Sequence, residues 1–301
     1  MQRYAPLMFL LFLVHGLTDI QAQSIKTQLL TYLDASFGKL PITLAEASYQ
    51  EIAPPAYQVM ADTAFKKQIP LIQLLGAKAR LEGKESQQAF AEWSLGFAPL
   101  ATAEAQSAIW GQLKQLQREA FSPKTQDQLK ILLLSSPSPM DKWVMLAGFA
   151  TKDTDVIRNI LLHKQEKYIQ QACRLALARM GEKAYTESFL KNIKKIPVED
   201  NFIYEIAPLV IYVRDKAAIA YLMELVIQDK GSCRPADAET DGKISCGYRL
   251  VEMLSPILID FPLKTNEEGE LQTADYPKAL AIARTWMKRQ KQHFQLDQSR
   301  Y

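Results

Sequence analysis

Few residues of this chain have the types and spacing that catalysis usually requires. Outside the apolar N-terminal stretch it has two histidines, His163 and His293, and neither has a cysteine or carboxylate at zinc-ligand spacing. The sequence has no Gly-x-Ser-x-Gly nucleophile motif and no glycine-rich phosphate loop. Cys173 with His163 could be imagined as a nucleophile and its base, but Cys173 lies in the helical stretch QQACRLALAR. We interpret it as a small buried thiol, and we predict no catalytic residue, cofactor or metal.

The acidic run DAETDG, which begins at Asp237, resembles the first half of a calcium-binding EF-hand loop. Asp237, Glu239 and Asp241 would supply oxygen ligands, and Gly242 would allow the sharp turn. The bidentate glutamate that closes such a loop would fall at position 248, which is Tyr248. A solvated acidic turn is therefore our main interpretation, and a weak calcium site is the alternative.

The remaining two cysteines flank this loop. Cys233 and Cys246 lie on either side of a polar, turn-rich segment, whereas Cys173 lies on a strongly helical one. In an oxidising compartment we therefore expect Cys233 to pair with Cys246. Closing the loop 233–246 would stabilise the fold by roughly 3 kcal/mol.

The N-terminus has the layout of a secretory signal peptide. Arg3 precedes an apolar core at Leu7–Val14, and Ala22 ends a plausible cleavage site. The apolar run is shorter than the ~20 residues that span a bilayer, and no later segment is long and uniformly apolar enough to do so. We expect a periplasmic or secreted protein that begins at residue 23. Its net charge of +3 favours no particular partner, and export removes cytosolic nucleic acid from the candidate ligands.

Helical periodicity dominates the rest of the chain, and no segment shows sustained β-alternation with hairpin signals. Connections are short and often contain Gly, Pro or a capping Asp. We expect helices at Ser24–Ala35, Leu44–Ile52, Ala56–Lys67, Pro70–Glu82, Ser86–Phe97, Ala103–Ala120, Lys124–Ser135, Met140–Ala150, Thr154–His163, Tyr168–Met180, Glu182–Lys195, Asn201–Val213, Lys216–Asp229, Gly247–Ile259 and Tyr276–Phe294.

The second half of the chain repeats itself. A shift of 34 residues places segment 168–193 on segment 202–227 without gaps, so that Ile169 meets Ile203 and apolar residues coincide along both. Segment 142–161 aligns as a third copy at an offset of 29. Each copy reads as a helix, a tight turn and a second helix, and a period near 30 residues built from helix pairs is typical of an α-solenoid.

A proline interrupts the apolar stretch YEIAPLVIYVRD, which begins at Tyr204. Pro208 lies after the first turn of an expected helix, and Pro256 has a similar place in VEMLSPILI. A proline at such a position kinks a helix, which stacked helix pairs in a curved array tolerate. By contrast, the second of the two prolines in YQEIAPPAYQV (49–59) suggests a loop there.

These features resemble HEAT-like repeats, whose first helix often carries a proline and whose second often starts at an aspartate. Asp153 and Asp215 occupy that turn position here, and Gly181 takes it in the middle copy. The resemblance covers roughly residues 140–294. It implies an all-α fold: an α-solenoid of antiparallel helix pairs, curved into a right-handed superhelix, with protein–protein contact as its default role.

The expected organisation therefore has three parts. Residues 1–22 form the signal peptide, 23–139 a helical region, and 140–301 the repeats with their disulfide loop and a C-terminal capping helix. The middle part has no clean period, so it could hold diverged repeats or form a separate subdomain.

Tyrosines of the repeat region are the best candidates for a binding surface. Tyr204, Tyr212 and Tyr221 recur at helical spacing, and their rings suit an interface. Our functional hypothesis is a non-enzymatic module that binds or scaffolds a protein partner in the bacterial cell envelope. The alternative is a hydrolase or lyase of an envelope polymer with its site in residues 24–139.

Overall fold

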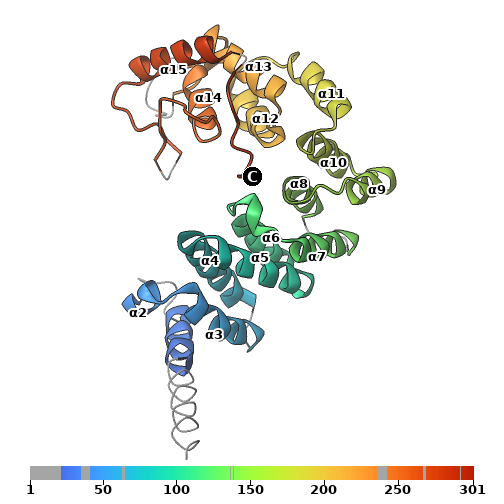
Figure 1. Ribbon diagram of the computed structural model, residues 1–301, viewed down its shortest axis with the longest axis vertical. Helices are drawn as coiled ribbons and strands as arrows, with labels where there is room; N and C mark the ends of the chain where they lie inside the picture. Colours follow the sequence, from blue (N-terminus) through green and yellow to red (C-terminus); the bar gives the residue numbers. More distant parts are fainter. Residues whose placement is uncertain are drawn as a thin grey trace, which may run out of the picture. The chain divides into compact units, whose positions relative to one another are not determined.

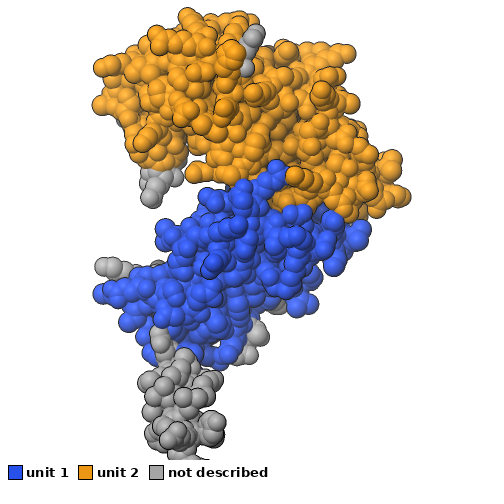
Figure 2. Space-filling model, in the orientation of Figure 1, with its two compact units in different colours: residues 1–139 blue, residues 140–301 orange. Residues whose placement is uncertain are grey.

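The computed structural model describes residues 22–34, 41–62, 65–135, 137, 139–235, 243–266, 269–291 and 293–301. Within these residues the chain is mostly helical, with a single two-stranded sheet, so the prediction of an all-α fold is confirmed. Contacts divide the chain into two compact units, residues 1–139 (unit 1) and residues 140–301 (unit 2) (Figure 2). The expected signal peptide lies outside the described residues except for Ala22.

Unit 1 is a cluster of helices centred on α4 and α5 (Figure 1). α4 packs against α3, α5 and α6, and α5 packs against α7 and the short helix η2. Its helices are residues 22–34, α2 (Ile42–Glu46), α3 (Tyr49–Asp62), α4 (Phe65–Glu82), α5 (Lys84–Phe97), η1 (Ala98–Leu100), α6 (Ala103–Leu113), η2 (Arg118–Ala120) and α7 (Pro123–Leu134).

Helix α3 corrects one expectation. It runs through Pro54 and Pro55 without a break, whereas the sequence suggested a loop at this point. Each proline lacks the N–H that would bond to the preceding turn. Ile52 and Ala56 are fully buried on either side, and we attribute the continuous helix to this packing, which outweighs the missing bonds.

Unit 2 consists of helices that pack largely in the order of the sequence. The helices α8, α10, α12 and α14 pack against one another in sequence, and α13 and α15 pack against α14 and each other. The elements are α8 (Met140–Ala150), α9 (Asp155–His163), α10 (Lys167–Arg179), α11 (Lys183–Ile193), η3 (Phe202–Ile206), α12 (Ala207–Val213), α13 (Lys216–Ile227), β1 (Ser232–Cys233), β2 (Ile244–Ser245), α14 (Gly247–Leu254) and α15 (Tyr276–Gln290).

Only some aligned positions of the sequence repeats have similar environments: Tyr168 is 58% exposed, whereas Phe202, 34 residues later, is fully buried. Ile169 and Ile203, which coincide at the 34-residue offset, are both buried. Asp215 caps α13, because its side chain accepts hydrogen bonds from the backbone N–H groups two and three residues later, at 2.8 and 3.2 Å. Asp153 Oδ1 accepts from the first N–H of α9 at 3.0 Å, and Gly181 adopts φ +96° after α10.

The proline in the apolar stretch that begins at Tyr204 marks a change of helix type. Residues Phe202–Ile206 form a π-helical turn, and Pro208 lies in the first turn of α12, which follows directly. A proline removes one backbone donor and its ring crowds the preceding turn, and a π-turn relieves that crowding by widening the helix. The helix distortion expected at Pro208 is therefore present.

Pro256 acts differently from the expected kink. Helix α14 ends at Leu254, before the proline, so the predicted helix to Ile259 was too long. Pro256 has no N–H with which to continue the helical hydrogen bonds, although Ser255 before it keeps helical dihedral angles (φ −52°, ψ −48°) and its N–H still donates to Val251 O at 2.9 Å. The hydroxyl of Ser255 donates to Leu263 O at 2.6 Å.

A small hairpin follows α13. β1 and β2 pair antiparallel, with Cys233 opposite Ile244, and the structure brings Cys233 and Cys246 to disulfide-bonding distance, with Cα atoms 5.0 Å apart. This is the pairing that the sequence predicted. The strands themselves, of two residues each, are too short to leave an alternating pattern.

The last residues of the chain fold back over unit 2. After α15 the backbone pairs with the segment that follows α14: Ile259 N donates to Gln295 O at 3.1 Å and Asp297 N donates to Ile257 O at 3.0 Å. Figure 1 shows this red segment passing α12 toward α8. In the described part of the chain, no helix combines the length and apolarity needed to cross a membrane.

Candidate functional site

The three tyrosines predicted to bind a partner have three different environments. Tyr204 is 63% exposed on η3, as expected of a surface residue. Tyr221 is half-buried, edge-on to Phe202 with ring centroids 6.4 Å apart. Tyr212 is only 4% exposed and its hydroxyl donates to Met145 O at 2.7 Å. The prediction was therefore wrong for Tyr212, which joins α12 to α8 inside the core.

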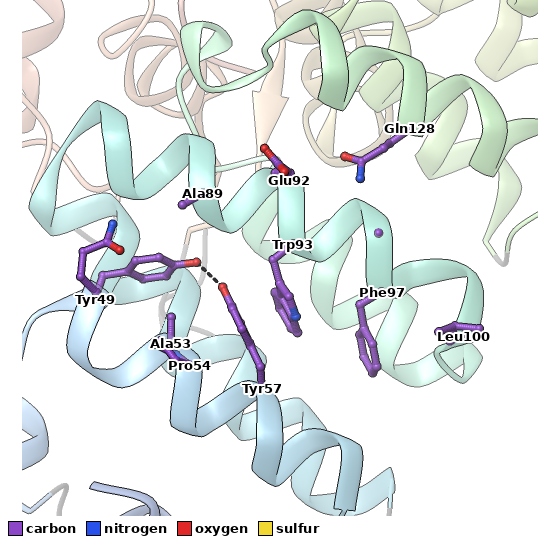
Figure 3. A pocket seen from close by; sticks show the side chains of 12 residues that line it. Tyr49, Ala53, Pro54, Tyr57, Ala89, Glu92, Trp93, Phe97, Leu100 and Gln128 are labelled. Carbon is purple, nitrogen blue, oxygen red and sulfur yellow. Dashed lines mark hydrogen bonds between the residues drawn. The ribbon is translucent and has the colours of Figure 1, made fainter. Parts of the chain in front are cut away.

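Unit 1 contains a more distinct feature, a groove of about 660 Å³ between α3, α5 and α7. Tyr57 from α3 stacks on Trp93 from α5, with centroids 4.5 Å apart and ring planes 10° apart. Trp93 stacks in turn on Phe97, at 5.4 Å and 13°. Figure 3 shows these rings side by side in one row, and we call the feature the aromatic groove.

The spacing of aromatic residues along α5 places two of these rings on one face of the helix. Trp93 and Phe97 are four residues apart on α5, so they lie on the same face, and Phe90 one turn earlier is fully buried and fixes that face toward the core. All three stacked rings are partly exposed. Because Trp93 is stacked on both faces, it presents mainly its edges. At one end the groove continues to Leu100, which is 81% exposed.

Polar groups at the edges of the aromatic groove leave it without net charge. The hydroxyls of Tyr49 and Tyr57 lie 2.6 Å apart in a hydrogen bond, which uses one of their two protons and leaves the other to donate. Burial raises the pKa of Tyr57 to about 12, so the hydroxyl stays protonated at neutral pH. Glu92 forms an ion pair with Lys124, which compensates the carboxylate of the groove.

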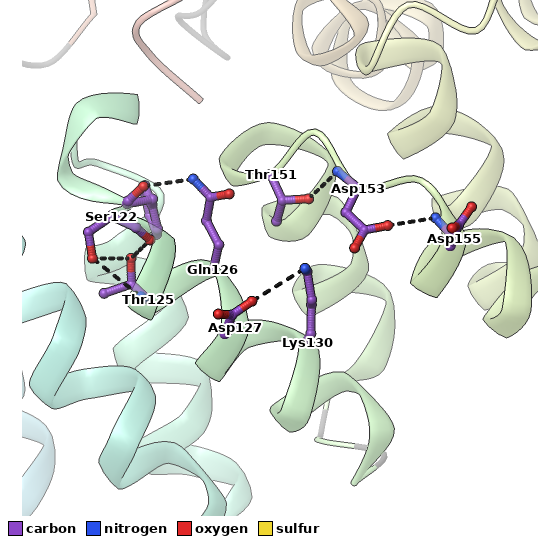
Figure 4. Close-up of polar contacts among 9 residues, drawn as sticks. Ser122, Thr125, Gln126, Asp127, Lys130, Thr151, Asp153 and Asp155 are labelled. Carbon is purple, nitrogen blue, oxygen red and sulfur yellow. Dashed lines mark hydrogen bonds and ion pairs between the residues drawn. The ribbon is translucent and has the colours of Figure 1, made fainter.

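Gln128 lies on the opposite wall of the aromatic groove. Ser122 caps the start of α7 because its side chain accepts from Thr125 N (Figure 4), and Gln128 lies one turn after Thr125. Its Oε1 atom is buried and has no hydrogen-bond partner among the described residues. Buried polar atoms are normally paired, but because this oxygen is buried, a molecule bound in the groove could not reach it; the Gln128 atom nearest to the exposed Gly96 is Nε2.

Unit 2 has a groove of different character, about 620 Å³ in volume, between α10, α11 and the start of the next repeat. Lys167 and Arg174 lie at its rim, and Phe189, Ile206 and Leu209 are part of its apolar floor. We call it the cationic groove.

Arginines also hold the returning C-terminal segment. Arg179 donates to Tyr212 O at 2.6 Å and to Arg300 O at 2.9 Å. Arg214, which is 3% exposed, donates to Tyr301 O at 3.1 Å. Burial lowers the pKa of the Arg214 guanidinium, and Arg179 lowers it further. These contacts bind backbone oxygens, so they fix the segment in place and suggest no catalytic role.

The residues considered for catalysis are not assembled into a site. Cys173 is buried, and burial raises its thiol pKa to about 12, which disfavours the nucleophilic thiolate. His163 is exposed and its Nδ1 lies 2.8 Å from Asn159 O in its own helix. Within the described residues, no three His, Cys, Asp or Glu side chains are grouped as a metal site would require. The acidic loop at 237–242 lies outside the described residues.

The chain matches no protein-family model, and the searches of curated proteins and of solved structures found no match to it. The two grooves are therefore interpreted from their own chemistry.

Sequence reasoning missed the aromatic groove because its residues come from three helices. The local signal was the pair of aromatic residues four apart in AFAEWSLGF, with Tyr49 and Tyr57 on an earlier helix. Such spacing is usually a sign of core packing, and only the tertiary structure shows that Trp93 and Phe97 remain partly exposed.

Proposed function

We propose that this chain is a non-enzymatic binding module that holds a protein partner in the cell envelope, and that the partner docks in the aromatic groove of unit 1. The stack of Tyr57, Trp93 and Phe97 carries this proposal. Aromatic side chains give large contact area at low entropic cost and are enriched at interfaces. Their exposure beside Leu100 leaves an apolar surface of the kind that marks interaction sites.

The groove favours an uncharged, apolar segment of the partner. Glu92 is compensated by Lys124, and Tyr57 is protonated at neutral pH, so the groove offers no net charge to attract an ion. Gln128 also lines the groove, and its side-chain amide can hydrogen-bond a peptide group. An apolar segment with a free backbone peptide group satisfies both conditions.

Hydrolysis of an envelope polymer, the alternative for residues 24–139, has weaker support. Glycoside hydrolysis usually needs two carboxylates that flank the scissile bond. Among the described residues that line the aromatic groove, Glu92 is the only carboxylate, and it is engaged with Lys124. Binding is therefore the better account of this groove.

The wider architecture belongs to the same proposal. The ordered packing of α8, α10, α12 and α14, with Asp153, Gly181 and Asp215 in the turns, supports a HEAT-like α-solenoid, and a right-handed curve is part of the proposal. The disulfide-bonding distance of Cys233 and Cys246 is compatible with export to the periplasm or the exterior after cleavage at Ala22. No membrane span and no nucleic-acid partner are part of this proposal.

The test blocks the groove without disturbing the stack. Gly96 lies in α5, is exposed and lines the groove. A Cβ at this position would contact only Gln128 Nε2, at 3.4 Å, so Gly96→Leu adds a side chain in the groove. It should also favour the helix, since glycine costs about 1 kcal/mol there. Gly111→Leu in α6 is the matched control, because a Cβ at Gly111 meets nothing within 4 Å.

Residues 23–301 and both variants would be used to capture partners from native envelope extract, with quantification by mass spectrometry. We expect a protein that the parent and Gly111→Leu retain and that Gly96→Leu loses by tenfold or more. Equal capture by all three chains, with circular dichroism showing each folded, would exclude the aromatic groove as the docking site. Turnover of cell-wall polymer by the parent would favour the hydrolase instead.

A further inference from the structure

The cationic groove of unit 2 has the features of a second binding site. It lies within a single unit, and its walls are α10 on one side and α11 with η3 and α12 on the other. The walls belong to two successive helix pairs, so the groove follows the junction between repeats. Its residues take no part in the aromatic groove.

Charge on the rim of this groove is uncompensated. Lys167 and Arg174 are exposed and lie on one helix seven residues apart, which corresponds to about 10 Å along the axis. Arg174 donates to Gln170 Oε1 at 3.3 Å, a neutral partner that orients the guanidinium without neutralising it. Among the described residues that line the groove there is no carboxylate. The acidic residues on the same elements, Glu166, Glu182, Glu187 and Glu205, lie outside the lining.

The floor and the remaining wall define what else the ligand must offer. Phe189, Ile206 and Leu209 are partly buried, so an apolar side chain placed on them would be removed from water. Gln171 and Asn192 on the two walls carry amide groups that both donate and accept hydrogen bonds. This combination suits a polypeptide backbone that carries apolar and acidic side chains.

We propose that the cationic groove binds an acidic peptide segment, with two carboxylates about 10 Å apart facing Lys167 and Arg174 and apolar residues between them on the floor. In a polyproline II conformation, which has three residues per turn, residues three apart lie on the same side of the chain and are separated by about 9 Å. A Glu-Leu-Leu-Glu core in this conformation has this arrangement. Planar pairing of a carboxylate with the guanidinium of Arg174 adds geometric selectivity.

The probe is a fluorescein-labelled peptide with a Glu-Leu-Leu-Glu core, compared with its Gln-Leu-Leu-Gln counterpart by fluorescence anisotropy. Exposed ion pairs contribute little individually, so we expect the acidic peptide to bind about three- to thirty-fold more tightly than the neutral one. This preference should shrink as NaCl is raised from 20 to 500 mM, because salt screens exposed charges.

Charge reversal provides the matched comparison. Lys167→Glu with Arg174→Glu should remove or invert the preference for the acidic peptide. Lys183→Glu with Lys191→Glu makes the same change in net charge on α11, at exposed positions outside the groove, and should leave the preference intact. All four positions are exposed, so both double variants should fold, and circular dichroism would verify this.

Three results would overturn the proposal. The first is equal affinity for the two peptides, which would mean that the apolar floor alone binds. The second is no binding of the acidic peptide to the folded parent at millimolar concentration. The third is binding of the parent to phosphatidylglycerol vesicles that Lys167→Glu with Arg174→Glu abolishes while neither peptide binds, which would assign the cations to a membrane surface.

Discussion

The burial of Tyr212 makes a quantitative prediction that separates it from Tyr204, eight residues earlier on the same helical stretch. Tyr212 is 4% exposed and Tyr204 is 63% exposed. Truncating a large buried aromatic side chain costs about 3–5 kcal/mol, whereas surface substitutions usually stay within about 0.5 kcal/mol. Tyr212→Ala should therefore weaken unit 2 severely, and Tyr204→Ala should leave it nearly unchanged.

The hydroxyl contribution can be isolated with phenylalanine. Tyr212 Oη donates to Met145 O at 2.7 Å, so Tyr212→Phe loses one hydrogen bond, worth about 1 kcal/mol net. The ring would remain packed in its cluster with Leu175, Ala178 and Val213. Tyr204→Phe is the matched control, since it removes the same hydroxyl from an exposed ring.

Native-state hydrogen exchange, measured on the whole chain, reports the change in local stability for each segment. A change of 1.4 kcal/mol in the free energy of local opening changes the opening equilibrium constant tenfold. Peptides from α8, α10 and α12 should therefore exchange roughly fivefold faster in Tyr212→Phe and at least a hundredfold faster in Tyr212→Ala. Peptides from α3 and α5 should not change in either variant. If Tyr212→Ala and Tyr204→Ala had equally small effects, Tyr212 would not lie between α12 and α8, and its exclusion from the binding surface would be wrong.

Three further predictions concern single local features. Replacing Cys233 and Cys246 together with serine should lower the free energy of unfolding by roughly 3 kcal/mol, measured by urea titration; adding reductant should destabilise the parent and leave the double variant unaffected. Asp215→Ala removes the cap of α13 and should lower the stability of the fold by about 1 kcal/mol, which would appear as faster amide hydrogen exchange in the first turn of α13. Asp275→Ala is the control, because it should affect only α15, which Asp275 caps. Burial raises the thiol pKa of Cys173 from its ordinary value of 9.0 to about 12, so the stability that the buried neutral thiol contributes is present below pH 9 and is lost as the pH rises toward 12. Iodoacetamide at pH 8 should therefore leave Cys173 unmodified in the folded chain and label it in urea. Rapid labelling of the native chain would contradict the burial of Cys173.

Local periodicity predicted most of the helices because each buries one face. Met140–Ala150 matches α8 at both ends, and Lys216–Asp229 differs from α13 only by its last two residues. The helix predictions failed where a local sequence preference, such as proline ending a helix, competed with tertiary packing. Pro54 and Pro55 predict a break, yet α3 continues beside a fully buried Ile52.

The binding residues were harder to predict than the helices because exposure depends on the neighbouring elements. Tyr204 and Tyr212 look alike in sequence, and only the presence of α8 beside Tyr212 distinguishes them. The same holds in unit 1, where Tyr57 and Trp93 are 36 residues apart in the sequence but their ring centroids are 4.5 Å apart. No sequence pattern within a single helix could predict that contact between α3 and α5.

The net charge of the chain also fails to predict a binding site, but the charge within each groove indicates what that groove can bind. A net charge of +3 over 301 residues favours no partner, and that inference holds for the chain as a whole. Locally, the ion pair of Glu92 with Lys124 leaves the aromatic groove neutral, while Lys167 and Arg174 face the cationic groove without a carboxylate among its described lining. The two grooves therefore call for ligands of different charge. A partner with one apolar segment and one acidic segment would satisfy both, and binding through both would be tighter than through either alone if its linker allows simultaneous contact.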